Sequence, residues 1–140
     1  MEPSRRKQLI RTYVASWLTQ DSKRFVSLLE EDVHVAECDG KVICGRDACQ
    51  RWFETWHAKP SDGVVQAWDI WHIACHEPRS ATVEWTFGCT CYGEISSFHG
   101  ASVFEFSADR IRAIREYRME VPTEDCRKQR MPPSERNDGK

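Results

Sequence analysis

The sequence lacks the features of a membrane protein or a nucleic-acid-binding protein. No apolar run approaches the roughly 20 residues that a transmembrane helix needs. The basic start, MEPSRRKQLIRTY, has no continuous apolar core behind it, so we expect no signal peptide. A net charge of −2 over 140 residues gives no general attraction to phosphate backbones. We therefore expect neither a membrane nor a nucleic acid as partner.

The cysteines lack the spacing of a disulfide or zinc framework. There are seven, an odd number, without a CxxC pair, and Cys89 and Cys91 share one face of a predicted strand. We therefore expect a reducing, cytoplasmic location in which most cysteines are small buried hydrophobic residues. The segment HIACH is similar to a metal site, but on a strand Cys75 points away from His72 and His76. No second half-site follows, and we predict no metal.

Periodicity predicts one α+β domain without internal repeats. One-sided apolar spacing predicts helices over about residues 3–20, directly after Asp21, and after Gly45 up to a PSDG turn. Alternating apolar residues predict the strands, at 31–38, 64–75, 81–92, 96–106 and 111–119, with 41–44 as a candidate extension. We expect the helices to lie on one face of a curved antiparallel sheet, which forms a cone around a pocket. This domain covers residues 1–120, and the charged residues 121–140 are predicted to be a mostly disordered tail.

Large aromatic residues and two polar positions indicate where chemistry could take place. Six tryptophans are many for this length and favour a core or cavity walled by flat side chains. The segment SSFHGASVFEF places Ser102 on a face with phenylalanines, and IRAIREYRM places Glu116 on a face with Ile114. If these two faces line a pocket, Ser102 and Glu116 are polar groups among apolar neighbours.

The chain resembles the SnoaL-like branch of the nuclear transport factor 2-like superfamily over about residues 5–120. The segments that carry the resemblance are RTYVASWLTQDSKRFVSLLEEDVHV, GRDACQRWF and GASVFEFSADRIRAIREYRM. The resemblance implies a cone-shaped α+β fold. It does not imply one activity, because this fold carries isomerases, cyclases, hydratases, epoxide hydrolases and non-catalytic binders.

The resemblance also carries over single positions. Tyr13 in RTYVASW matches the tyrosine that donates to the oxyanion in ketosteroid isomerases, and Glu37 in HVAEC falls near their carboxylate base. Ser102 stands where those enzymes keep a second, protonated acid, which argues against steroid isomerisation. Glu116 in IREYRM matches the last-strand aspartate of SnoaL-type polyketide cyclases and is one methylene longer.

Each candidate also has a purely structural interpretation. Glu116 could form a surface ion pair with Arg115 or Arg118, whereas burial among aromatic rings would raise its pKa and a nearby Arg118 would lower it. Glu37 could be an exposed strand end, and Tyr13 a core aromatic residue. Ser102 is a polar liner rather than a nucleophile, because no GxSxG motif surrounds it.

The leading hypothesis is a cytoplasmic homodimer that binds an apolar, ring-containing or acyl molecule and transfers protons on it without a cofactor. Glu116 or Glu37 would be the acid–base group, and Tyr13 a hydrogen-bond donor. The predicted ligand-binding residues are Trp17, Trp52, Phe53, Trp56, Trp85, Phe87, Cys89, Ser102, Phe104, Ile114 and Arg118. The dimer would form through the outer sheet face, where His99 and the apolar residues of the last two strands lie. The alternative is a non-catalytic binding or interaction module, in which tryptophans fill the cavity and Glu116 faces solvent.

Overall fold

The computed structural model describes residues 1–120, and they form the predicted series of helices and strands. The helices are α1 (Pro3–Leu18), α2 (Ser22–Ser27) and α3 (Arg46–His57). The strands are β1 (Leu29–Ala36), β2 (Val42–Cys44), β3 (Val64–His76), β4 (Ser80–Cys91), β5 (Glu94–Phe106) and β6 (Ile111–Arg118). Asp21 caps α2 as predicted, since its carboxylate accepts the backbone N–H of Arg24 at 3.0 Å. The tail predicted at 121–140 lies outside the described residues.

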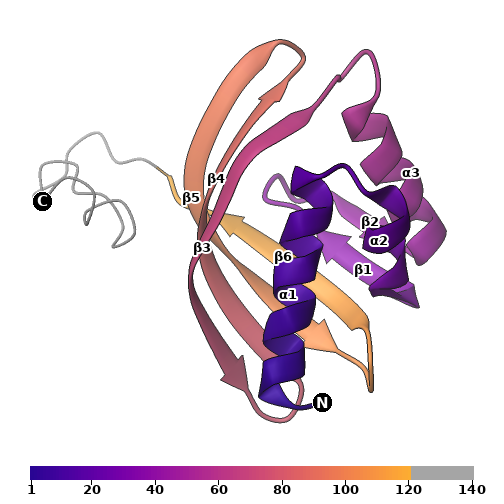
Figure 1. The fold of residues 1–140 in the computed structure, drawn as a ribbon, viewed down its shortest axis with the longest axis vertical. Helices are drawn as coiled ribbons and strands as arrows, with labels where there is room; N and C mark the ends of the chain where they lie inside the picture. Colours follow the sequence, from indigo (N-terminus) through magenta and orange to yellow (C-terminus); the bar gives the residue numbers. More distant parts are fainter. Residues whose placement is uncertain (121–140) are drawn as a thin grey trace, which may run out of the picture.

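The strands form one curved sheet in the order β2-β1-β6-β5-β4-β3. The long strands β3, β4 and β5 bend strongly, and the helices lie within the curve (Figure 1). The predicted α+β cone is therefore confirmed. One pairing differs from the prediction, because β1 runs parallel to β6 while every other neighbouring pair is antiparallel. The short turns that predict antiparallel pairing link only consecutive strands, and no such turn joins β1 to β6.

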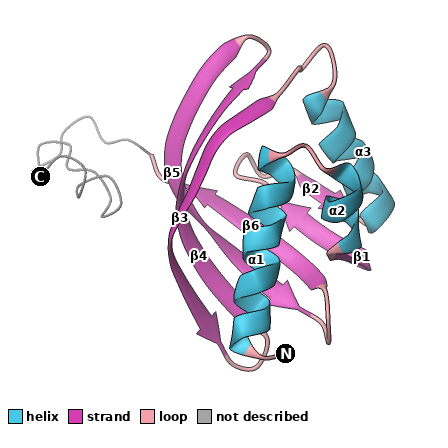
Figure 2. Cartoon of the chain, in the orientation of Figure 1, coloured by secondary structure: helices cyan, strands magenta, loops and turns pink. Residues whose placement is uncertain are grey.

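The helices cover the inner face of the sheet and leave the outer face open (Figure 2). Helix α1 packs along β3, and α3 packs on β1 and β2. The apolar stripe predicted on the first helix is buried, with Leu9, Ile10, Tyr13 and Trp17 at most 5% exposed. None of the helices that the structure describes is long and apolar enough to cross a membrane.

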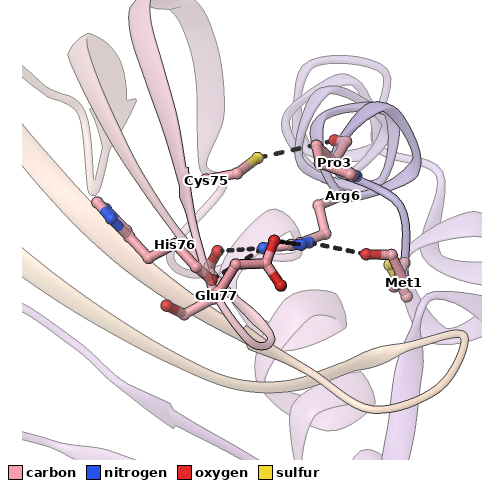
Figure 3. Close-up of polar contacts among 7 residues, drawn as sticks. Met1, Pro3, Arg6, Cys75, His76 and Glu77 are labelled. Carbon is pink, nitrogen blue, oxygen red and sulfur yellow. Dashed lines mark hydrogen bonds and ion pairs between the residues drawn. The ribbon is translucent and has the colours of Figure 1, made fainter.

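A buried arginine fixes the start of α1 to the turn between β3 and β4 (Figure 3). Arg6 is 1% exposed, and its Nη1 donates to the carbonyl oxygens of His76 and Ser80, each at 2.9 Å. Its Nε donates to the carbonyl oxygen of Met1 at 3.1 Å, and its Nη2 to the carboxylate of Glu77 at 3.1 Å. The cation is therefore satisfied almost entirely by main-chain oxygens, which compensates for its burial.

The β5–β6 hairpin has the predicted inner face. In its register Ser102 pairs with Glu116, and Gly100 pairs with Arg118. Trp85 of β4 packs across β5 and donates from Nε1 to Ser102 Oγ at 2.9 Å. Gly100 makes this close packing possible, because a Cβ there would lie 2.6 Å from the Trp85 ring and collide with the carbonyl oxygen of Tyr117.

We expect Ser102→Ala to destabilise the protein by about 1–3 kcal/mol, because it leaves the buried indole N–H of Trp85 without an acceptor. Chemical denaturation measures the difference in the free energy of unfolding. Ser97→Ala on the same strand is the matched control, since Ser97 is exposed. Equal stabilities of the two variants would show that the Trp85 bond contributes nothing.

The outer face of the sheet carries polar pairs beside apolar residues. Arg115 and Glu105 form an ion pair at 2.7 Å, and His99 Nδ1 lies 3.0 Å from Thr86 Oγ1. Ala101, Val103 and Ala113 are partly exposed on neighbouring strands, and Tyr117 is 55% exposed. The two-fold dimer through this face stays a prediction.

Candidate functional site

A cavity of about 240 Å³ lies between the helices and the inner face of the sheet. Its lining comes from α1, α3, β3, β4, β5, β6 and the segment that follows β1. Eight of the lining residues are aromatic, three are acidic and two are cysteines: Tyr13, Trp17, Trp52, Trp56, Trp68, Trp85, Phe87, Phe98, Glu37, Asp39, Glu116, Cys38 and Cys89. The tryptophans therefore wall the cavity and do not fill it.

The helix side of the cavity is a tryptophan wall. Trp52 and Trp56 lie four residues apart on α3, so both project from one face of the helix. The ring centroid of Trp17 lies 4.9 Å from that of Trp52 and 5.5 Å from that of Trp56, with interplanar angles of 62° and 74°. Gly63 leaves room for this wall, because a Cβ there would lie 2.5 Å from the Trp56 ring.

The sheet side is a second aromatic wall. Trp85 and Phe87 lie two residues apart on β4, so their side chains project from the same face of the sheet. Trp68 of β3 packs edge-to-face on both, at angles of 82° to Trp85 and 86° to Phe87. Phe98 of β5 extends this wall, and the guanidinium of Arg118 lies 4.2 Å above its ring.

Glu116 is the carboxyl group of the inner face of β6. It is partly buried and makes no hydrogen bond or ion pair with another residue of the described chain. Burial, with a smaller contribution from the negative charge of Glu37, raises the pKa of Glu116 to about 8. Arg118 forms no ion pair with Glu116, and its guanidinium lies over the Phe98 ring. At neutral pH Glu116 therefore mostly holds a proton.

Tyr13 projects from α1 towards the same region. Its hydroxyl is buried and lacks a hydrogen bond of normal geometry to the rest of residues 1–120. Burial raises the pKa of Tyr13 well above its ordinary value, and the charges of Glu116, Cys49 and Glu37 raise it further. The indole of Trp17 acts in the opposite direction. The hydroxyl therefore stays protonated and can donate.

The segment after β1 supplies the remaining polar lining. Burial and the charge of Asp39 raise the pKa of Glu37, while Lys41 lowers it. Cys38 is exposed as a residue, but partial burial of its thiol raises the pKa to about 11, and the charge of Glu116 adds to the shift. Burial also raises the pKa of Cys89. Neither thiol is activated as a nucleophile, because the reactive form is the thiolate.

The sequence model for the SnoaL-like domain matches residues 10–114, which is most of the chain. The chain belongs to the SnoaL-like domain family. The predicted resemblance is confirmed, and the match begins within α1 and ends within β6. Among curated proteins no sequence matches.

Solved structures share the nuclear transport factor 2-like fold of this SnoaL-like domain. An LEH-like epoxide hydrolase from M. tuberculosis is 15% identical with a TM-score of 0.73, over 83% of this chain and 84% of that one. SalBIII, an epoxide hydrolase/cyclase-like enzyme of pyran ring formation in the polyether salinomycin, is 15% identical with a TM-score of 0.71, over 84% and 93%. A candidate polyketide cyclase from Xanthomonas campestris pv. campestris is 17% identical with a TM-score of 0.67, over 81% and 90%. Identities this low establish the fold alone.

Most residues predicted for the site of this SnoaL-like domain line the cavity. The predicted acid–base and donor residues Glu116, Glu37 and Tyr13 all do so. So do six predicted ligand-binding residues: Trp17, Trp52, Trp56, Trp85, Phe87 and Cys89. Their convergence makes acid–base chemistry on a bound molecule geometrically available.

Five predicted ligand-binding residues lie outside the lining. Phe53 stacks on Phe25 beneath the tryptophan wall, at a ring separation of 4.5 Å. Phe104 and Ile114 are 2% and 1% exposed in the core below the cavity. Ser102 is 1% exposed and is occupied by Trp85, and Arg118 lies on the Phe98 ring. A residue on the cavity-facing side of a strand can therefore still be buried in the core and not line the cavity.

Four lining residues were missed by sequence analysis. Cys38 and Asp39 were assigned to a strand end and a turn. Trp68 lies between two irregularities in the β3–β4 register, so alternation along the strand does not give its face. Phe98 was assigned to the inner face of β5, and that assignment could have included it. No group of three histidine, cysteine or acidic side chains in residues 1–120 is arranged to hold a metal ion.

Proposed function

We propose that this SnoaL-like protein binds a compact small molecule in the cavity and transfers protons on it, with Glu116 as the acid. The observation that carries the proposal is a carboxyl group with a pKa of about 8 that lines an aromatic cavity and has no hydrogen-bond or ion-pair partner within residues 1–120. A perturbed titratable group in a concave apolar site is typical of acid–base catalysis.

The two glutamates have different parts in this mechanism. Glu116 holds a proton near neutral pH and donates it to a substrate oxygen. Glu37, which lines the cavity from the segment after β1, takes a proton from substrate carbon or from a water molecule. The hydroxyl of Tyr13 donates a hydrogen bond to the same substrate oxygen. One proton is given and one is taken, so isomerisation, ring closure and hydration all balance without a cofactor.

The size of the cavity limits the substrate. Pockets for drug-sized ligands measure about 300–1,000 Å³, and this one measures about 240 Å³. The aromatic walls favour a flat or ring-shaped molecule. A compact ring bearing an oxygen function is therefore the substrate that we propose.

We expect turnover to fall as the pH rises through about 8, because Glu116 loses the proton that it donates. Two probes test this. Hydration of cyclohexene oxide is followed by chromatography of the diol, and isomerisation of a β,γ-unsaturated cyclohexenone by the ultraviolet absorbance of the conjugated ketone. A rate that stays constant from about pH 6 to 9 would contradict Glu116 as the acid. Saturable binding without turnover of any ring epoxide or unsaturated ketone would favour the non-catalytic alternative.

A further inference from the structure

The lining of the cavity has an unusual charge composition. Glu37, Asp39 and Glu116 contribute carboxyl groups, and the part of the lining that the structure describes contains no lysine, arginine or histidine. The nearest cation that packs on a lining ring is Arg118, which lies over Phe98. A bound anion would therefore meet three acidic residues and no basic residue among these lining side chains.

Several aromatic rings around these carboxyl groups are steeply inclined to one another. Trp17 meets Trp52 and Trp56 at 62° and 74°, and Trp68 meets Trp85 at 82°. Rings set close to perpendicular enclose a space from several directions, as in the aromatic cages that bind organic cations. The face of a tryptophan ring attracts a cation more strongly than that of any other side chain.

One aromatic ring of the lining, Phe98, already makes a cation–π contact within the protein. The guanidinium carbon of Arg118 lies 4.2 Å from the centre of the Phe98 ring, within the range of a cation–π contact. Phe98 also lines the cavity and packs with Trp85 and Phe87. The chemistry that holds Arg118 at the edge of the site is available to a ligand inside it.

Displacement of water from the cavity favours a charged ligand over a neutral one. Any ligand removes water from the acidic side chains, and an unpaired carboxylate without water is unfavourable. Asp39 already accepts the backbone N–H of Lys41 at 3.0 Å. A neutral hydrocarbon gives the carboxylates of Glu37 and Asp39 no further partner, whereas a cation compensates their charge.

We propose that the natural ligand is a compact organic ammonium ion, with its charged head among the tryptophan rings and beside Glu37, Asp39 and Glu116. This inference rests on the proposed function, because it takes the same cavity as the substrate site and names the class of its ligand. It also deepens the mechanism, since a bound cation stabilises the carboxylate of Glu116 and so makes Glu116 a stronger acid.

The test compares choline with its neutral carbon isostere, in which a tert-butyl group replaces trimethylammonium. Five of the six tryptophans line the cavity, so tryptophan emission of the full chain reports binding there. We expect choline to bind at least about tenfold more tightly than the isostere at pH 7. Asp39→Asn should weaken choline binding severalfold and leave isostere binding unchanged. Asp32→Asn, an exposed position on β1 outside the lining, is the matched control and should change neither.

Each other result overturns the inference, and the results separate it from the proposed function. Equal affinities for choline and the isostere would show that the cavity binds ligands but does not select them by charge. Binding of a neutral ring compound without binding of choline would lead to the same conclusion, and the proposed function would stand. If no compound changes the emission, both the inference and the proposed function fail.

A pH titration of choline binding adds an independent result. The titratable groups around Glu116 and Glu37 are Tyr13 of α1, Cys38, Asp39 and Lys41 after β1, Cys89 of β4 and Arg118 of β6. Because the cation favours ionised Glu116, choline affinity should rise between about pH 7 and 9, and Glu116→Gln should abolish that rise. A choline affinity that does not change with pH would contradict contact with Glu116.

Discussion

Glu116→Gln should reduce kcat about 10²- to 10⁴-fold for any substrate of the protein, the loss that follows removal of a general acid. Glutamine has nearly the shape of a protonated glutamate but cannot give up a proton at its amide. Since Glu116 is mostly protonated at pH 7, the variant should bind ligands at that pH almost as well as the unaltered protein. The measurement is kcat at pH 7 beside the dissociation constant from tryptophan emission.

Two further variants separate catalysis from general damage. Glu94→Gln changes an exposed carboxylate at the start of β5, outside the cavity, and should leave kcat unchanged. Glu37→Gln removes the proposed base and should therefore lower kcat as well. It also removes the negative charge that helps to raise the pKa of Glu116, so the pH midpoint of the residual activity should move below 8. A Glu116→Gln variant that retains more than about a tenth of the unaltered kcat would exclude Glu116 as the proton donor.

The sequence predicts the strands well where local chemistry sets them. The hairpin of β5 and β6 follows from two alternating segments and a short SADR turn, and both its pairing and its inner face are confirmed. The parallel pairing of β1 with β6 could not be predicted in this way. The paired residues Ala36 and Arg115 are far apart in the chain, and their pairing depends on how the whole sheet curves around the helices.

The site is predicted less completely than the fold, for a physical reason. Alternation assigns Ser102, Phe104, Ile114 and Glu116 to one inner face, but only Glu116 lines the cavity. Whether a residue of the inner face lines the cavity or is covered depends on which helix packs over it. The sequence of the strand does not contain that information. Periodicity placed Tyr13 on the apolar stripe of the first helix and Glu37 on a strand face with Val33 and Val35, and resemblance to the family added their proposed roles. Trp68 escaped both, because irregular register in β3 conceals its face.

Arg6 connects stability to this site, although sequence analysis did not single it out. It ties α1, which carries Tyr13 and Trp17, to the far end of β3, which carries Trp68. The relative position of the helix and the sheet therefore depends on one buried cation and the carbonyl groups around it (Figure 3). Loss of that cation should affect both the fold and the cavity.

Arg6→Met should destabilise the protein by about 3–5 kcal/mol, because it leaves three partly buried main-chain carbonyl groups without their donor. These carbonyls belong to Met1, His76 and Ser80. For a domain of this size the loss corresponds to a fall in Tm of roughly 10–15 °C. Thermal unfolding followed by circular dichroism measures it.

Two companion variants determine which contacts of Arg6 matter. Arg5→Met removes an exposed arginine whose contact is with Gln8, one turn along the same helix, and should change Tm little. Glu77→Gln removes the carboxylate partner, which is 81% exposed, and should also cost little. If Glu77→Gln destabilises the protein as much as Arg6→Met, the ion pair and not the carbonyl groups holds Arg6. A small effect of both variants together with a large effect of Arg6→Met would establish the main-chain contacts as the link between α1 and the sheet.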